Sequence, residues 1–429
     1  MWPFKTKKQI VQHTKAQKII VPSSNWNSYV LQSDGMPLEA SIAMEMYDEN
    51  TAVATSVDLI STPIENMSLI LVDQQTNDIV TNSTSEKLLD FIKQPNGFET
   101  QSEFIGTLVR HYKLTGNAHI ALIGTGQPAE MHSVAPSIVS IIENTNDGYP
   151  DEYLISEGVA SGNFKRDANI GKITRFLNSN GIMEFYHIMA YSNSSKKIKG
   201  SSPLEAAAAD VRQQIAGRIH NVSLLKQGGK MSLAIIFKDE VPPTSDTIKD
   251  REEMIKDRIE GPGKAGKIGV FSSKDGIDIQ NFGSTNNDMD YKNLDMMASK
   301  AIYNRFGIPL PLVDTAGSTF SNVESSIPYF YRQVVLPTAN VIFKNMSKVL
   351  LPRFGFDSRR YVLTYDENKI ATLAKLKLDE LKERKEIGIE TINELRGLLP
   401  GRPDVDGGDE ILVSMTQTPL TNVGSTVGM

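Results

Sequence analysis

The chain has 429 residues, of which 40% are hydrophobic and 22% charged, and its formal net charge at pH 7 is -6. This composition predicts a folded protein with several domains or subdomains, because a chain with so many apolar residues does not remain disordered. The absence of cysteine excludes disulfides, a thiol nucleophile and iron–sulfur ligation, and the mild acidity argues against a broad basic face that grips nucleic acid.

The N-terminal segment, residues 1–39, is predicted to be a flexible basic arm. Five lysines and no acidic residue occur before Asp34. A solvated tail and an arm that touches an anionic partner are both compatible with this pattern. The segment lacks the apolar run of a signal peptide, and the chain lacks a run of about 18 apolar residues, so no membrane-spanning helix is expected.

Several helix starts are predicted from a Ser or Thr followed three residues later by Glu, because this capping box satisfies two free backbone N–H groups. The pairs are Ser83/Glu86, Thr100/Glu103, Ser202/Glu205, Ser321/Glu324 and Thr391/Glu394. Each pair precedes a segment with helical spacing of its apolar residues. Five such pairs indicate a chain with many well-defined helices.

The first half of the chain is predicted to be an α+β domain. The expected helices and strands, in chain order, are a helix at 51–61 ending near Pro63, a strand at 67–72, helices at 85–93 and 101–114, a strand at 118–123 and a strand-rich region at 137–187. Gly116 follows a helix at the position that favours a left-handed residue.

Two long helices and an insert between them follow. Ser202 caps the first helix and apolar residues recur at spacings of three and four up to Lys226: Leu204, Ala208, Val211, Ile215, Ile219 and Val222. A helix of this length spans roughly 37 Å. Residues 230–287 read as a small β-α-β-β module, with a strand at 232–237, a charged helix at 245–259 and strands at 267–272 and 277–282. Residues 288–306 read as the second long helix. The pattern predicts two struts that carry a head piece.

The C-terminal part begins with a polar loop at residues 312–320. A long helix to about residue 351 follows, which should bend because Pro328 and Pro337 lie inside it. A strand at 361–365, a charged helix at 367–385 and a short helix at 391–398 complete the predicted elements. From Gly401 onward Pro, Gly, Thr and Ser dominate, and the last twenty residues are expected to form a loose tail.

The strongest enzyme-like pattern is Gly261 to Lys267, which fits seven positions of a phosphate-binding P-loop. Ile268 stands where Mg²⁺ binding needs a hydroxyl, and the segment follows a predicted helix and precedes a strand, the reverse of a P-loop. A P-loop-like nucleic-acid enzyme is therefore the disfavoured alternative, tested by ATP turnover that is lost in Lys267→Ala.

No other pattern predicts catalysis, a cofactor or a metal. The six histidines have no zinc-ligand spacing, and His187 is expected to be a packed or partly exposed histidine in a strand. Asp404 to Glu410 lacks the spacing of a calcium loop, so an acidic glycine turn is favoured over a cation site. The sequence predicts a protein that is not an enzyme, with no cofactor and no metal.

The order of the motifs resembles the portal (head-to-tail connector) proteins of tailed bacteriophages, over about residues 45–410. The segments similar to family motifs are Leu114-Thr-Gly-Asn-Ala118, Val134-Ala-Pro136, His187-Ile188, Gly200-Ser-Ser-Pro-Leu204, Phe306-Gly-Ile-Pro309, Ser318 to Glu324, Thr391 to Arg396, and Gly407-Gly-Asp409. Each motif is short, but their shared order and separations are specific to the family.

The resemblance implies a portal-type fold, α+β, with a mixed α/β wing, long stem helices, a small α/β clip insert and a helical crown. The implied segments are an arm (1–39), the first part of the wing (40–201), a stem helix (202–229), the clip (230–287), a second stem helix (288–311), a tunnel loop (312–320), the kinked helix and second part of the wing (321–366), the crown (367–400) and a tail (401–429).

The resemblance also implies a function without catalysis. Twelve such subunits usually form a ring at one capsid vertex of the virion, assembled in the host cytoplasm, through which double-stranded DNA enters and leaves. The implied partners are the terminase large subunit, the major capsid and scaffold proteins and a head–tail adaptor, with no membrane. The same fold could serve a prophage-derived or gene-transfer particle, an alternative that the sequence leaves open.

Two sets of site residues follow from the resemblance. The tunnel loop would line the channel with Asp314, Thr315, Ala316, Gly317, Ser318 and Thr319. The clip would present cations to the motor or to DNA: Lys249, Arg251, Lys256, Arg258, Lys264 and Lys267. The charged helix that carries four of these cations is also compatible with a merely solvated face.

Overall fold

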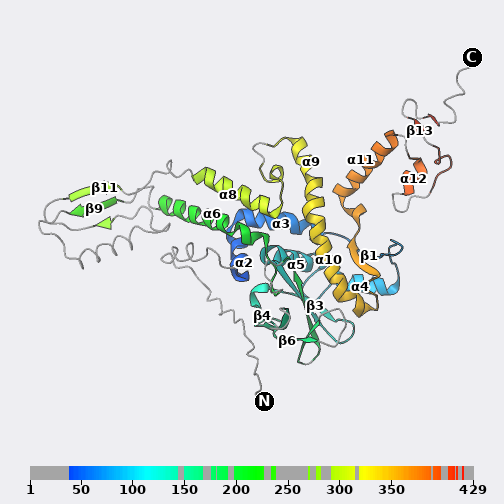
Figure 1. Ribbon diagram of the computed structural model, residues 1–429, viewed down its shortest axis with the longest axis horizontal. Coiled ribbons are helices and arrows are strands. Elements are labelled where there is room, and N and C mark those ends of the chain that lie inside the picture. Colours follow the sequence, from blue (N-terminus) through cyan, green and yellow to red (C-terminus); the bar gives the residue numbers. More distant parts are fainter. Residues whose placement is uncertain are drawn as a thin grey trace, which may run out of the picture.

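The computed structural model is elongated, with a small sheet at one end and the C-terminal helices at the other (Figure 1). It describes residues 38–143, 149–167, 175–179, 181–191, 198–226, 233–237, 269–270, 277–281, 291–314, 318–387, 390–397, 404–410, 412–413 and 418–419. Two long helices, α6 (Pro203–Lys226) and α8 (Tyr291–Phe306), lead from the small sheet into a central body. Within these ranges, no helix is long and apolar enough to cross a membrane.

The central body contains four helices of the N-terminal half. These are α2 (Ala40–Glu49), α3 (Thr51–Glu65), α4 (Ser83–Lys93) and α5 (Gln101–Thr115). The expected end of α3 near Pro63 is wrong by a few residues, because the helix continues to Glu65 with Ile60 and Ile64 fully buried. That burial offsets the backbone hydrogen bond that Pro63 removes in the last turn.

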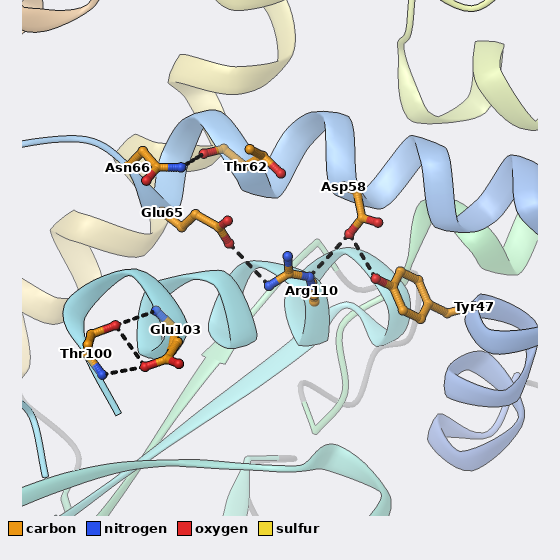
Figure 2. Close-up of polar contacts among 8 residues, drawn as sticks. All are labelled: Tyr47, Asp58, Thr62, Glu65, Asn66, Thr100, Glu103 and Arg110. Atoms are coloured by element: carbon orange, nitrogen blue, oxygen red, sulfur yellow. Dashed lines mark hydrogen bonds and ion pairs between the residues drawn. The ribbon is translucent and has the colours of Figure 1, made fainter. Parts of the chain in front are cut away.

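A half-buried ion network joins three of these helices (Figure 2). Arg110 of α5 lies between two carboxylates of α3, 3.3 Å from Asp58 and 3.2 Å from Glu65. Tyr47 of α2 donates a hydrogen bond of 2.8 Å to Asp58. The network therefore fixes α2 and α5 on the same face of α3.

The predicted capping boxes divide into confirmed and misplaced ones. Figure 2 shows the reciprocal box of Thr100 and Glu103, and Thr391 with Glu394 forms another. The box at Ser83 is wrong: Asn82 and Ser85 form it, one residue earlier. The box at Ser321 is also wrong, because Thr319 caps the helix and accepts from Asn322 N–H.

At the start of α6, the capping box predicted for Ser202 and Glu205 is confirmed for Ser202. The Ser202 hydroxyl accepts a hydrogen bond of 2.9 Å from the backbone N–H of Leu204, which caps the helix. The same hydroxyl donates to the carbonyl oxygen of Lys113, also at 2.9 Å. Ser202 therefore caps α6 and fastens it to the end of α5.

An antiparallel sheet of seven strands, in the order β3-β2-β8-β7-β6-β5-β4, forms the lower part of the body in Figure 1. The strands are β2 (Asn117–Ile123), β3 (Glu130–Val134), β4 (Val139–Glu143), β5 (Pro150–Ile155), β6 (Gly162–Asp167), β7 (Arg175–Asn178) and β8 (Met183–Met189). The edge strands β3 and β4 are joined only by residues 135–138, so the sheet curves strongly. Apolar residues from all seven strands fill the inside of the curve as a separate core.

The second part of the body is a two-stranded sheet with a long kinked helix. Strands β1 (Leu69–Asp73) and β12 (Tyr361–Tyr365) pair antiparallel. The helical segment comprises α9 (Phe320–Phe330), a π-helical turn (Tyr331–Val335) and α10 (Leu336–Leu350). The predicted bend takes the form of this wider, π-helical turn between Pro328 and Pro337. The wider turn accommodates the backbone hydrogen bonds that are missing because proline has no N–H.

One buried ion pair fastens this second part to the seven-stranded sheet. Arg353, in the turn that follows α10 (Leu351–Phe354), is paired with the buried Glu184 of β8. Tyr186 donates a hydrogen bond to the other oxygen of Glu184. This ion pair therefore joins residues that are far apart in the sequence.

The small sheet confirms three of the predicted strands of the insert. Strand β9 (Leu233–Phe237) lies between β10 (Gly269–Val270), which runs parallel to it, and β11 (Ile277–Asn281), which runs antiparallel. A parallel pair needs a crossover connection, which is where the sequence predicts a helix at 245–259. That helix lies outside the described residues.

The C-terminal part contains α11 (Ala371–Ile387) and α12 (Ile392–Gly397), close to the predicted positions. The prediction that the last twenty residues form a loose tail is wrong at two short segments, because β13 (Leu412–Val413) pairs antiparallel with β14 (Thr418–Pro419). Val413 and Thr418, which lie opposite each other in this pair, are residue types that favour strands.

Candidate assembly and channel surfaces

Two of the glycine-containing motifs meet where the helical pair, α6 and α8, leaves the central body. Gly116 ends α5 in the left-handed conformation, and its carbonyl oxygen accepts a hydrogen bond of 2.8 Å from Ala190 N–H. A Cβ on Gly200 would lie 2.6 Å from that same nitrogen of Ala190 and closer still to the Gly116 oxygen. Glycine at position 200 therefore lets two backbone segments cross just before α6 begins.

Asn117 binds the two segments together. Its side-chain oxygen accepts hydrogen bonds from the Gly200 N–H, at 2.8 Å, and from Nε2 of His187, at 2.9 Å. Because Nε2 of His187 donates, Nδ1 is free to accept from the Tyr153 hydroxyl, 2.8 Å away. His187 is thus a packed strand histidine, within the range predicted, and both of its ring nitrogens are hydrogen-bonded.

Burial favours the neutral form of three histidines, His187, His111 and His119. Loss of solvent lowers the pKa of His187 to about 3, with the charge of Lys199 as a smaller cause, and lowers the pKa of His111 to about 4. Burial lowers the pKa of His119, which stacks on Phe185, in the same direction. Neutral imidazoles are therefore part of the folded state at this junction.

We expect the protein to lose stability in acid because of these histidines. Folding lowers their pKa values, so their contribution to the free energy of unfolding is complete above about pH 6.5. As pH falls toward 4 and 3 that contribution is lost, because the unfolded chain binds protons that the folded chain does not. The loss is about 1.4 kcal/mol per pH unit for each such histidine. Urea unfolding between pH 7 and pH 4.5 measures it, and His187→Gln should give a shallower slope than the unchanged chain. An equal slope in the variant would contradict this assignment.

The distal half of the helical pair exposes apolar side chains. On α6 the predicted stripe is buried at Leu204, Ala208 and Val211, whereas Val222, farther along, is exposed. On α8, Leu294 and Met297 lie three residues apart on one face, and Met297 is 66% exposed. The central body therefore covers only part of these helices, and the uncovered part is suited to contact another protein surface.

The structure describes three of the six predicted tunnel-loop residues. Asp314 follows a short 3-10 turn (Leu310–Leu312) and lies 3.4 Å from Lys300 of α8. The Ser318 hydroxyl donates to the Asp314 carbonyl oxygen at 2.7 Å, and Thr319 caps α9. These contacts bring the two ends of the loop together beside α8. Thr315, Ala316 and Gly317 lie outside the described residues.

The other predicted site residues are not described. The P-loop-like segment 261–267 lies outside the described residues. The same holds for all six predicted clip cations: Lys249, Arg251, Lys256, Arg258, Lys264 and Lys267. Among the residues that the structure does describe, no three His, Asp or Glu side chains are grouped as metal ligands.

The acidic segment near the C-terminus is a glycine turn, as predicted, and it wraps around Asn393 of α12. The Asn393 side chain accepts from Val405 N–H at 2.9 Å and donates to Asp409 at 2.8 Å. Its backbone N–H donates to the carbonyl oxygen of Gly408, where a Cβ would overlap the Asn393 side chain. The two C-terminal motifs of the sequence therefore form one structural unit.

Comparison with known proteins gives a consistent result over most of the chain. A family model described as "Phage portal protein" matches residues 51–399. Proteins of Rickettsia bellii and Rickettsia felis, both described only as uncharacterized, are 23% and 22% identical over 372 residues, which is 86% of this chain and 91% of each relative.

Solved structures share the fold. The neck of an empty gene transfer agent (GTA) particle, computed with C6 symmetry, has a TM-score of 0.58 at 22% identity and covers 86% of this chain and 95% of its own. The neck of a native GTA particle, computed with C12 symmetry, has a TM-score of 0.56 at 20% identity and covers 89% and 99%.

Proposed function

Because the chain belongs to the phage portal protein family, we propose that copies of it form a ring at one vertex of a virion or phage-like particle. The ring is the channel through which double-stranded DNA is packaged and ejected. It docks the terminase motor and, later, a head–tail adaptor, and it contacts the capsid and scaffold proteins during assembly in the host cytoplasm. The family is structural rather than enzymatic.

The observation that carries this proposal is the family match over residues 51–399, which spans the central body, both long helices and the C-terminal helices. The exposed apolar side chains of the helical pair support the ring, since a closed ring buries such surfaces between neighbouring copies. The necks with C6 and C12 symmetry that share the fold are consistent with a ring of twelve subunits.

The proposed parts of the portal follow the chain. The helical pair is the stem, the small sheet belongs to the clip, the central body is the wing, and α11 with α12 is the crown. The loop from Asp314 to Thr319 lines the channel, and the undescribed cations from Lys249 to Lys267 face the motor or DNA. A mildly acidic chain suits a conduit, because few phosphate contacts keep DNA from binding tightly.

Imaging of the purified protein, combined with native mass measurement, tests the proposal. We expect closed rings with a central opening and a mass of about twelve subunits. A protein that remains monomeric both alone and with its capsid and scaffold proteins would contradict it.

We also expect the ion pair between Asp314 and Lys300, which holds one end of the loop to α8, to affect DNA passage but to add little to folding stability. Asp314→Asn removes the ion pair with Lys300, and both side chains are more than a third exposed, so the loss of folding stability should stay below about 1 kcal/mol. If the loop lines the channel, DNA packaged per particle should fall severalfold while rings still form. Lys348→Gln, an exposed lysine of α10, is the control. Unchanged packaging in Asp314→Asn would argue against this placement of the loop.

A gene-transfer particle is the alternative setting, favoured by the GTA necks that share the fold. The DNA inside purified particles separates the two settings. Phage particles should hold one viral genome, whereas gene-transfer particles should hold short fragments of host DNA.

A further inference from the structure

A buried amide network joins the helical pair to the central body. Gln214 of α6 and Asn50, which precedes α3, are 3% and 1% exposed, and the Asn50 side chain donates to the Gln214 side-chain oxygen at 2.9 Å. Nε2 of Gln214 lies 2.7 Å from the Ser299 hydroxyl and 2.9 Å from the Asp295 carbonyl oxygen, both on α8. Three segments separated by 164 and 81 residues therefore meet at one side chain.

The backbone fixes the orientation of both amides. The side-chain oxygen of Asn50 accepts from the backbone N–H of Val53 at 3.1 Å, which caps α3, so its NH₂ group faces Gln214. The carbonyl of Asp295 can only accept, so the NH₂ group of Gln214 faces α8. Each amide therefore has one arrangement that satisfies all partners, and such a network specifies a single packing.

The network lies where the helical pair leaves the protein's own core. Toward the central body, the next stripe residue on α6, Val211, is fully buried. Away from it, Val222 on α6 and Leu294 on α8 are exposed. Contacts at this level thus determine the direction in which the distal halves of both helices point.

We propose that Gln214, acting through Asn50, Asp295 and Ser299, sets the inclination of the helical pair and thereby selects the number of subunits in the ring. Neighbouring subunits are related by about 30° in a twelve-membered ring and by about 28° in a thirteen-membered one. A difference so small requires a rigid junction, and apolar packing alone tolerates rearrangement more readily than a directional network does. The inference rests on the ring proposed above.

The test compares Gln214→Met with Gln213→Met in the full-length protein. Methionine keeps the length of glutamine but makes none of its hydrogen bonds, and Gln213 is an exposed neighbour on the same helix. Native mass spectra of rings, assembled well below the unfolding temperature, give the distribution of subunit numbers. We expect a single number for the unchanged chain and for Gln213→Met, and a broadened or shifted distribution for Gln214→Met.

A second, milder variant keeps the test informative if Gln214→Met fails to fold. Ser299→Ala removes only one acceptor and leaves Gln214 bonded to Asp295, so it should fold and broaden the distribution less than Gln214→Met. If both variants form rings with the unchanged subunit number, the inference is overturned, even where their unfolding temperatures fall. If the unchanged chain forms no ring under any condition, the proposed function itself fails, which is a distinct result.

Discussion

Replacement of Met297 with glutamate is expected to abolish ring formation while leaving the folded subunit intact. Met297 is 66% exposed and lies beside Leu294 on the face of α8 that the protein's own core does not cover. A carboxylate placed in a dry contact between copies remains unpaired and costs roughly 3–5 kcal/mol at each contact. Every subunit of a ring carries the same contact, so the cost recurs around the whole assembly.

Met297→Leu is the matched control, because it keeps an apolar side chain of similar volume and should still form rings. Thermal unfolding of the Met297→Glu subunit should change little, since exposed substitutions usually shift stability by less than about 0.5 kcal/mol. Size-exclusion chromatography with light scattering separates rings from monomers. Rings of normal mass from Met297→Glu would remove this face from the proposed contact.

The main elements were predictable from sequence because their signals are local. The helix from Ser202 to Lys226 has a cap, a proline at its first position and a long apolar stripe, and the structure places α6 at Pro203–Lys226. The strand at 361–365 consists mainly of residues that favour strands, Tyr, Val and Thr, and was predicted to the residue. The spacing of apolar residues within a few turns fixes such elements.

The misplaced helix caps show the limit of local signals. Near residue 83, the residues Asn82, Ser83 and Ser85 all favour helix starts, and the choice fell on Asn82 with Ser85. Near residue 320, Thr319 and Ser321 competed, and Thr319 caps the helix. Neighbouring caps differ by a few tenths of a kcal/mol, so packing of the following helix decides between them.

The partners in the amide network could not have been predicted, because they are brought together by contacts across long stretches of chain. Gln214 looks like any polar residue on a long helix, and Asn50 like an ordinary cap. A buried glutamine can be recognised in a sequence only when the apolar stripe of its helix is known. Gln214 lies between Val211 and Ile215, two residues that the sequence had placed on the buried face of α6. A polar residue next to such a stripe was therefore a detectable, though weak, sign.

The portal motifs acquire a physical meaning from the crossing at Gly200. The segment from Leu114 to Ala118 and the segment from Gly200 to Leu204 are far apart in the sequence, with 83 positions from Asn117 to Gly200, yet they touch at Gly116 and Gly200. Asn117 accepts a hydrogen bond from Gly200 N–H, and Ser202 donates one to Lys113, the residue just before the first segment. The two motifs together anchor the base of α6 to the body.

Gly200→Ala is therefore expected to destabilise the protein and to loosen the base of α6. The new Cβ would meet backbone atoms of Gly116 and Ala190, which have no rotamer through which to move away. Overpacking of this kind typically costs about 1–3 kcal/mol, and we expect the upper end because the crossing also carries the Ala190–Gly116 and Gly200–Asn117 hydrogen bonds.

Gly97→Ala is the control, because a Cβ there meets nothing within 4 Å and its backbone is not left-handed. Urea unfolding should show a clear loss for Gly200→Ala and a change of less than about 1 kcal/mol for Gly97→Ala. If Gly200→Ala forms rings at all, their subunit number should spread, since α6 is then less firmly held at its base, although the Gln214 network is unchanged. Equal stability of the two variants would mean that the crossing relaxes easily, and that the glycine in this motif serves another purpose.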